Sequence, residues 1–272
     1  MTLTNAPLVE IIAELRWEPQ LPGIVFPPAS SSRPQFSQHS AQADVSDIEA
    51  FFSRLGKAVG TLGFSNTERL LPAGLPVISQ QPMYRYRKDG SPTLYQVGAG
   101  LFSANTTPPY ISWEHFIEDV RGGIAALLAS RGEVEQDGKF SSIGLRYIDS
   151  FKGDVIAGRS TAQFLEEVFK LKISLPDAIA KNIAEDGQYA PLLQLGLPLE
   201  NGVVMNLIIG EAYANEERII VMDTTVATTS PIPANLDAVI ATLTNGHDII
   251  HDMFFELTAP IKDQMQTTSG EV

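Results

Sequence analysis

Apolar and polar residues alternate at the start of the chain. In residues 6–17 one face is apolar, whereas Glu10, Glu14 and Arg16 stand on the other face. The apolar positions are Val9, Ile11, Ala13, Leu15 and Trp17. A period of two residues is typical of a strand with one buried face, and residues 140–151 show the same pattern. Residues 18–45 are rich in Pro, Ser and Gln, so we expect a surface excursion after the first strand.

Apolar residues at helical spacing predict a helix after each of these strands and another at the end of each half of the chain. Ser46-Asp47-Ile48-Glu49 has the capping-box pattern that opens a helix, and Ser160-Thr161-Ala162-Gln163 repeats this pattern in the second half. Ser112 is predicted to begin the second helix. A long apolar stripe predicts a helix over residues 234–257, and Thr258 is expected to cap a short last helix.

The sequence between the predicted helices has the patterns of strands. Residues 75–87 and 92–103 flank Lys88-Asp89-Gly90-Ser91, which is a hairpin signal. Gly98 and Gly100 predict a bulge or a close approach of another backbone segment in the second of these strands. A further group of strands is predicted in the second half of the chain, at residues 190–197, 202–213 and 218–226.

The two halves of the sequence repeat the same order of elements. Their opening strands also share a tripeptide, Leu15-Arg16-Trp17 in one and Leu145-Arg146-Tyr147 in the other. We therefore predict an α+β fold built from a duplicated strand-helix-meander-helix unit, with antiparallel sheet and helices packed on one face. The predicted repeats are residues 1–132 and 139–272. In architecture alone, two such units joined edge to edge resemble TATA-binding-protein-like repeats.

Composition and charge narrow the function classes. The chain of 272 residues has 32 acidic and 19 basic side chains, and its formal net charge of −13 makes nucleic acid an unfavourable partner. The absence of cysteine excludes disulfides, thiol catalysis and cysteine zinc sites. Residues 1–7 lack the basic region of a signal peptide, and the apolar stretch at 202–210 is too short for a membrane span. We therefore expect a cytoplasmic protein that does not enter the membrane.

Three motifs carry a resemblance to a known family. The opening Asn5-Ala6-Pro7-Leu8-Val9-Glu10, continued by Glu14-Leu15-Arg16-Trp17, is similar to the start of a sporadically distributed, uncharacterised prokaryotic family. The string Gly144-Leu145-Arg146-Tyr147-Ile148 and the last long helix, with His247 and Leu257-Thr258, resemble the same family. The chain departs from it at Asp149, where the family is expected to have Asn. The family has no activity to carry over, and its patchy occurrence implies an accessory or defence-associated gene product.

Two arginines interrupt the apolar strands at equivalent positions of the predicted repeat. If they lie on neighbouring strands, Arg16 and Arg146 can clamp a carboxylate or phosphate. The alternative, which we favour, is that they form ion pairs with Glu10, Glu14 or Asp149. The candidate ligand-binding residues are Arg16, Arg146, Tyr147, Asp149, Tyr84 and Tyr86.

The run from Met83 to Lys88 is both basic and aromatic. On a strand, Tyr84 and Tyr86 share one face, and Arg85 and Arg87 share the other. Such a face can stack bases, but the run is more often an ordinary strand with a solvated basic edge, which is the interpretation we favour.

Metal and cofactor motifs are incomplete. His247 and His251 stand four apart on a predicted helix, yet no third ligand is evident, so we expect no metal site. Glu133-Val134-Glu135 lacks the lysine of the triphosphate-tunnel signature, since Asp137 stands in its place. No phosphate-binding glycine loop or Gly-x-Ser-x-Gly elbow occurs, and we expect no cofactor.

These observations lead to two function hypotheses. The first is a non-enzymatic binding or assembly protein of unknown ligand. The alternative is an enzyme or sensor that acts on a small anionic ligand held by Arg16 and Arg146. We expect self-association or a protein partner, because a meander sheet leaves its outer strands unpaired. Residues 203–209 are also apolar on both faces and therefore need cover on both.

Overall fold

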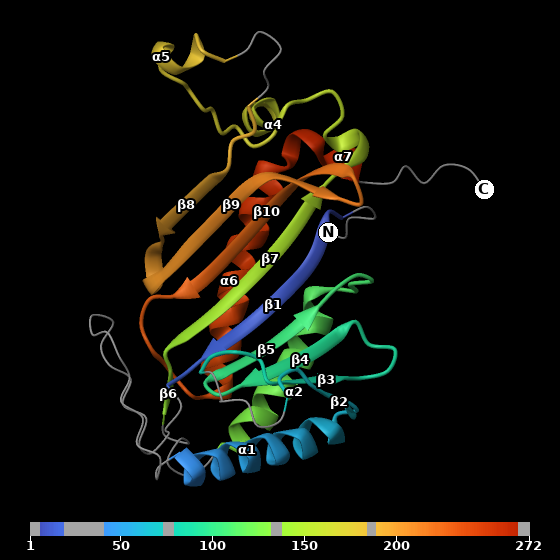
Figure 1. Ribbon diagram of the computed structural model, residues 1–272, viewed down its shortest axis with the longest axis vertical. Helices are drawn as coiled ribbons and strands as arrows, with labels where there is room; N and C mark the ends of the chain where they lie inside the picture. The colour runs from blue at the N-terminus through green and yellow to red at the C-terminus, as the bar shows by residue number, and fades with distance from the viewer. Residues whose placement is uncertain (1–5, 19–40, 73–78, 132–137, 184–188, 266–272) are drawn as a thin grey trace, which may run out of the picture. The chain divides into compact units, whose positions relative to one another are not determined.

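The computed structural model describes residues 6–18, 41–72, 79–131, 138–183 and 189–265 (Figure 1). Its contacts divide the chain into two compact units, each of which combines strands with helices. Unit 1 comprises Met1–Ile11, Gly144–Thr229 and Leu243–Val272, and unit 2 comprises Ile12–Ile143 and Ser230–Thr242. The predicted α+β class is therefore confirmed. Among the described helices, none combines the length with the apolar composition that a membrane span requires.

Unit 2 contains antiparallel strands in the order β2-β3-β4-β5, and β5 is followed by the second part of β1. The first residues of β1 belong to unit 1. The elements of unit 2 are β1 (Leu8–Arg16), α1 (Ala41–Thr61), β2 (Asn66–Arg69), β3 (Tyr84–Arg87), β4 (Thr93–Gly98), β5 (Leu101–Thr106), α2 (Trp113–Ser130), β6 (Lys139–Phe140) and β11 (Ile232–Pro233).

Helices α1 and α2 pack on the same face of these strands. Gly56 of α1 lies against Tyr86 of β3, and Gly123 of α2 lies against Tyr95 of β4 and Phe102 of β5. Tyr86 and Tyr95 are opposite each other in the β3–β4 register and so point to one side. A Cβ at Gly123 would come within 2.9 Å of the Tyr95 ring, so the glycine allows α2 to lie close to the sheet.

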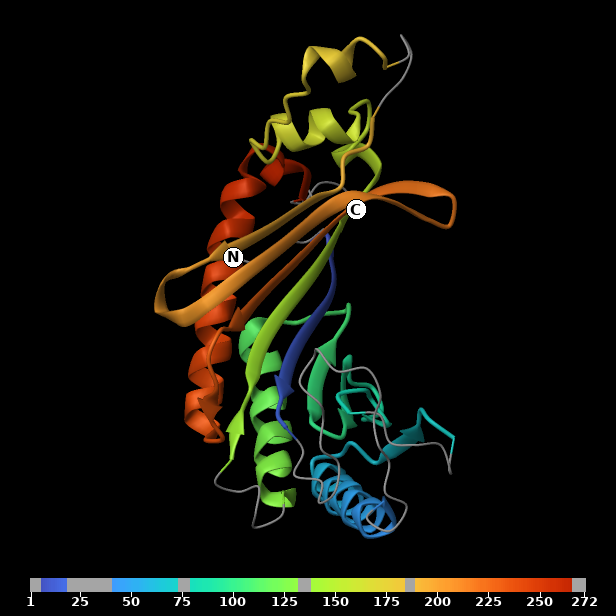
Figure 2. The ribbon, with the colours of Figure 1, turned by 60° about the vertical axis from the view of Figure 1, so that its left-hand side comes forward.

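Unit 1 contains strands in the order β1-β7-β10-β9-β8, and the pairs from β7 to β8 are antiparallel. Figure 2 shows helix α6 along one face of these strands. The remaining elements are β7 (Ser142–Phe151), η1 (Gly153–Val155), α4 (Thr161–Glu167), α5 (Asp177–Ala180), β8 (Leu193–Pro198), η2 (Glu200–Gly202), β9 (Val203–Ala214), β10 (Glu217–Thr228), α6 (Leu236–Leu257), η3 (Ala259–Ile261) and α7 (Lys262–Met265). The first residues of β7 and α6 belong to unit 2.

The core of unit 1 lies between the covered face of the strands and the helical segments. Its members include Phe151, Phe164, Phe169, Leu207, Ile209, Ile220, Met222 and Ile261. Burial of a side chain of this size contributes about 1.5–3 kcal/mol of transfer free energy. Alternate residues of β10 are buried in this core, which identifies the face of the sheet that the helices cover.

Three helix starts were predicted at the correct residue or close to it. The hydroxyl of Ser112 accepts the N–H of His115 at 3.3 Å and caps α2. Ser160 and Gln163 form the predicted capping box, with distances of 3.2 and 2.8 Å. The side chain of Asn235 accepts two N–H groups at the start of α6, one residue beyond the predicted helix start. Short polar side chains satisfy N–H groups that have no partner within the helix.

Other local predictions were wrong. Residues 92–103 do not form one bulged strand, because a turn at Gly98-Ala99-Gly100 separates β4 from β5 and Gly100 adopts a φ of 76°. The alternative interpretation, a close backbone approach, is confirmed at Gly98, where a Cβ would stand 1.8 Å from the carbonyl oxygen of Gln81. Helix α1 begins at Ala41, so its start lies five residues before Ser46, where the capping pattern placed it. The hydroxyl of Thr258 donates to the carbonyl of Phe254 and makes no capping bond to the next turn. The expected excursion at 18–45 lies mostly outside the described residues.

Each half of the chain follows the order strand, helix, strands and helix. The first half runs through β1, α1, β2 to β5 and α2, and the second through β7, α4, β8 to β10 and α6. Arg16 and Arg146 both lie on strands, as an internal repeat requires. The duplication, and its division into residues 1–132 and 139–272, stay predictions.

Candidate functional site

The predicted ligand-binding residues fall into two groups, one in each unit. Arg146, Tyr147 and Asp149 lie on β7 in unit 1, and Arg16, Tyr84 and Tyr86 lie on β1 and β3 in unit 2.

Both arginines of the predicted anion clamp already bind carboxylates. Arg16 donates from Nε to Glu14 Oε1 at 2.6 Å and from Nη1 to the Gln80 side chain at 3.1 Å. Arg146 donates from Nε and Nη2 to the two oxygens of Asp223, at 2.7 and 2.5 Å. An anionic ligand would have to displace these carboxylates. The predicted ion pair between Arg16 and Glu14 is present.

Asp149 cannot pair with Arg146, because residues three apart on a strand point to opposite faces. Arg146 is exposed, whereas Asp149 is 3% exposed on the face that the helices cover. Arg146 binds the carboxylate of Asp223 on the neighbouring strand β10. This part of the ion-pair prediction was wrong.

Tyr84 and Tyr86 do share one face of β3, but helix α1 covers that face. Tyr86 is 2% exposed, its hydroxyl donates to the carbonyl of Phe52 at 3.3 Å, and burial raises its pKa to about 12. The hydroxyl of Tyr84 donates to Glu49 at 3.1 Å. The ring of Tyr86 therefore offers no open face for stacking a base.

A polar cluster lies on the covered face of unit 1, and we define it as Tyr147, Asp149, Thr224 and His247. Alternation along β7 places Tyr147 and Asp149 on the same side, and the register places Thr224 opposite Tyr147. The hydroxyl of Tyr147 and Nδ1 of His247, on α6, are 2.7 Å apart. Thr224 is fully buried, and its hydroxyl has no hydrogen-bond partner in the described part of the chain.

Asp149 is the chemically unusual member of the polar cluster. Burial raises the pKa of its carboxyl to about 7, because water no longer solvates the charged form. Its strand neighbours Phe151 and Met222 belong to the apolar core. A carboxyl group that changes charge near neutral pH is a candidate for function. Sequence reasoning selected Tyr147 and Asp149 but missed Thr224, whose only signal is its position opposite Tyr147.

The two histidines of α6 do not form part of a larger ligand group. The ring centroids of His247 and His251 are 5.6 Å apart, and Nδ1 of His251 lies 3.4 Å from Asp252. The described residues contain no group of three or more His, Asp or Glu side chains able to hold a metal ion.

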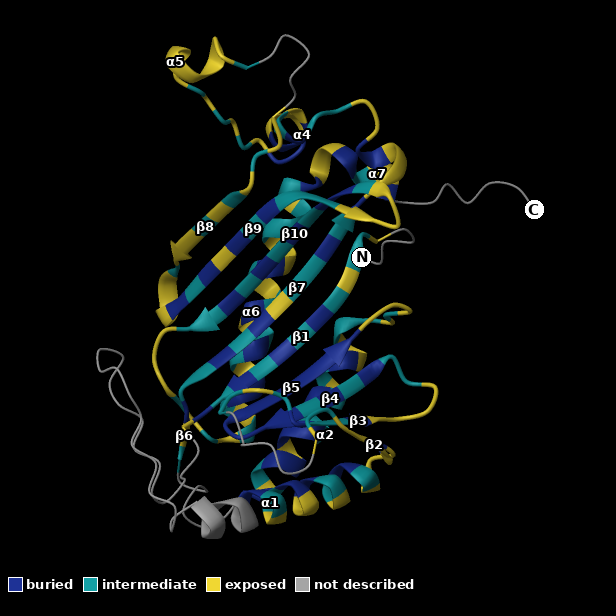
Figure 3. Ribbon diagram, viewed as in Figure 1, coloured by how far each residue is buried: buried dark blue, intermediate teal, exposed yellow. Residues whose placement is uncertain are grey.

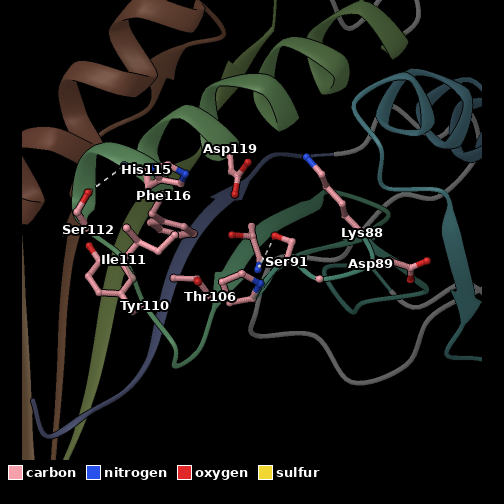
Figure 4. Close-up of a pocket in the computed structure, with 13 residues that line it drawn as sticks. Lys88, Asp89, Ser91, Thr106, Tyr110, Ile111, Ser112, His115, Phe116 and Asp119 are labelled. Carbon is pink, nitrogen blue, oxygen red and sulfur yellow. Dashed lines mark hydrogen bonds between the residues drawn. The ribbon is translucent and has the colours of Figure 1, made fainter. Parts of the chain in front are cut away.

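A pocket of about 230 Å³ lies in unit 2, between the β3–β4 turn and the start of α2 (Figure 4). Lys88 and His115 line it together with the carboxylates of Asp89 and Asp119. Figure 4 shows these four polar side chains around the pocket, with no two of them joined by a dashed line. The pocket offers polar contacts of both signs and no arrangement of nucleophile and base.

The outer strand of unit 1 has an unusual edge. β8 ends the strand order, and on its inner side it pairs with β9. The backbone N–H of Leu199 donates to the carbonyl of Val203, in the same register as the β8–β9 pairs. Alternate residues of an antiparallel strand bond to the same neighbour. Leu193, Leu195 and Leu197 therefore bond inward to β9, whereas the backbone groups of Gln194 and Gly196 point outward.

This edge, the β8 edge (Tyr189–Leu199), is apolar and carries no charge. Leu192 is 75% exposed, Leu197 is 38% exposed and Tyr189 is 37% exposed. Figure 3 shows β8 as a largely exposed strand. Proteins usually protect an outer strand with charges, bulges or a covering segment, because its free backbone groups can pair with another chain.

Strand β2, the outer strand of unit 2, carries this protection. It has four residues, all of them exposed. Glu68 forms an ion pair with Arg85 at 3.0 Å, and Arg69 forms one with Glu49 at 3.1 Å. Charges on a short strand discourage pairing with another chain. Within the described part of the chain, the β8 edge is therefore the outer strand that lacks such charges.

Comparison with known proteins adds no family to this description. No family model matches the chain, and no curated protein matches it.

Proposed function

We propose that the protein is a non-enzymatic binding and assembly protein that associates through the β8 edge with a strand of another polypeptide chain. The observation that carries this proposal is the row of outward backbone groups on an uncharged, leucine-rich strand. Strand addition to a sheet edge is a common mode of protein recognition: backbone hydrogen bonds supply affinity and alternate side chains supply specificity.

The energetics favour a weak and reversible association. Each new backbone hydrogen bond contributes about 0.5–1.5 kcal/mol, and covering Leu192 and Leu197 adds the transfer of their exposed surface. The hydrogen bonds and the apolar burial have to offset the free energy lost when two chains give up independent translation and rotation, which is about 4–15 kcal/mol. The net charge of −13 adds repulsion between copies, and salt screens that repulsion.

The alternative function, an enzyme or sensor for a small anion, finds less support in the contacts. Arg16 and Arg146 are each held by a carboxylate. Asp149, the group with the most unusual pKa, is almost fully buried. These contacts favour the binding protein over the enzyme or sensor.

Substitution of Gly196 by Lys is expected to abolish the association. A Cβ at this position would meet only the Asn206 side chain, at 3.6 Å, so the variant should fold normally. The added charge would lie on the edge where a second strand has to pair. Light scattering at micromolar protein in physiological salt should give a mass above the 29.5 kDa of one chain for the wild type, and the single-chain mass for Gly196→Lys.

Thr67→Lys provides the matched control. It adds the same charge to an exposed residue of the other outer strand, β2, and should leave the wild-type mass unchanged. A wild-type mass of one chain at every concentration would contradict self-association. An equal mass for wild type and Gly196→Lys above 29.5 kDa would place the association elsewhere.

A further inference from the structure

We infer that the partner strand at the β8 edge is β8 of a second copy of this chain, antiparallel to the first, about a two-fold axis at Leu195. This inference rests on the proposed function and specifies its partner and register. In this register Gln194 of one copy lies opposite Gly196 of the other, and Leu195 lies opposite its own equivalent.

Backbone groups of β8 point alternately toward β9 and away from it, and this alternation restricts the registers that a second copy can adopt. Only Gln194, Gly196 and Pro198 of the strand direct their backbone groups outward, because the leucines between them bond to β9. An antiparallel partner must therefore match outward residues with outward residues. A two-fold axis at Leu195 matches Gln194 with Gly196 twice, so the N–H groups and carbonyls of Gln194 and Gly196 are satisfied in each copy.

Pro198 selects among the remaining registers. Proline has no N–H, so a carbonyl placed opposite it receives no hydrogen bond. A shift of the axis to Gly196 would place the Gln194 carbonyl of each copy against Pro198 and leave it without a donor. A shift to Gln194 would require Leu192, which precedes β8, to take part in the ladder.

The side chains agree with the same register. On the covered face, Leu195 meets Leu195 of the second copy and Leu193 meets Leu197, so an apolar ladder continues across the axis. On the other face, Gly196 leaves room for the Gln194 side chain. No charged residue lies between Tyr189 and Leu199, so the two strands bring no like charges together although each chain carries −13.

The test uses single cysteines, since the natural chain has none. Gln194→Cys and Gly196→Cys chains are prepared separately and oxidised alone or as an equal mixture. Residues opposite each other in a hydrogen-bonded antiparallel pair have Cα atoms about 5.5 Å apart, within the range of roughly 4.4–6.8 Å for a disulfide. Gln194 and its own equivalent would be roughly 9 Å apart in this register, too far for a disulfide.

We expect the mixture to give at least tenfold more disulfide-linked dimer than either chain oxidised alone. Tyr213→Cys, at an exposed site on β9 that faces no second copy in this arrangement, measures random collision. Light scattering of the reduced proteins is recorded in parallel, together with Gly196→Lys.

The other outcomes separate this inference from the proposed function. Dominant self-linkage of Gln194→Cys or of Gly196→Cys would overturn the register and retain association at the β8 edge. If no disulfide-linked dimer forms but Gly196→Lys still lowers the mass to that of one chain, the two-fold pairing is overturned and the proposed function is retained. If no disulfide-linked dimer forms and Gly196→Lys leaves the mass measured by light scattering unchanged, both the two-fold pairing and the proposed function are overturned.

Discussion

Replacement of Asp149 by Asn is expected to change the free energy of unfolding more favourably at pH 8 than at pH 4. The difference between the two effects should be on the order of 4 kcal/mol. The carboxyl is almost fully buried, and burial raises its pKa from 3.8 to about 7. Between these values the unfolded chain is ionised at this residue while the folded chain holds the proton. The wild type therefore loses stability as the pH rises from about 4 to 7, and asparagine, which does not ionise, removes this loss.

Urea unfolding followed by circular dichroism at pH 4.5, 6 and 8 would measure this effect. The difference in unfolding free energy between Asp149→Asn and the wild type should grow with pH and level off above 7. Asp89→Asn, in the exposed β3–β4 turn, makes the same substitution at the surface and is measured as the matched control. A pH-independent difference for Asp149→Asn would mean that the carboxyl titrates normally in the folded protein.

Substitution of Gly98 by Ala is expected to cost more than about 3 kcal/mol, or to prevent unit 2 from folding, because it overpacks a rigid site. A Cβ at Gly98 would stand 1.8 Å from the backbone carbonyl oxygen of Gln81. The neighbouring backbone is fixed on both sides: the N–H of Gln80 donates to Ala99 at 2.6 Å and the N–H of Met83 donates to Val97 at 2.7 Å.

Gly210→Ala is the matched control for this prediction. Its Cβ would also come close to a neighbour, 2.8 Å from Leu192, but that contact is the end of an exposed and flexible side chain. Its thermal midpoint should stay within a few degrees of the wild type, whereas Gly98→Ala should fall far below it or yield no folded protein. Similar midpoints for the two variants would show that the loop of Gln81 moves away at little cost.

The sequence was informative about elements and less informative about their partners. Alternation identified β1 and β7, and short polar side chains identified the starts of α2 and α4. The turn at Gly98-Ala99-Gly100 was missed because glycines within a strand pattern indicate a bulge as well as a reversal. Helix α1 extends past Ser46 to Ala41, so a capping pattern alone did not fix its start.

The candidate sites depend on strand order, which the sequence pattern does not contain. Arg146 binds Asp223 only because β10 lies beside β7. Alternation along the strand was enough to predict that Asp149 and Arg146 point to opposite faces of β7. The burial of Asp149, however, depends on the helical segments that cover its face of the sheet. The sequence alone shows that residues 189–199 carry no charge. This absence indicates a site for pairing only because β8 is an outer strand, which the sequence pattern does not predict.

Residue-resolved amide hydrogen exchange of Gln194 and Gly196 tests the central claim most directly. These two N–H groups point away from β9, so they exchange freely in a single chain and become protected when a second strand pairs with the β8 edge. We predict that their exchange slows as the protein concentration rises, while the exposed amide of Thr67 on β2 exchanges at an unchanged rate. Fast exchange of both amides at every concentration, in a sample that light scattering shows to be associated, would contradict pairing through β8.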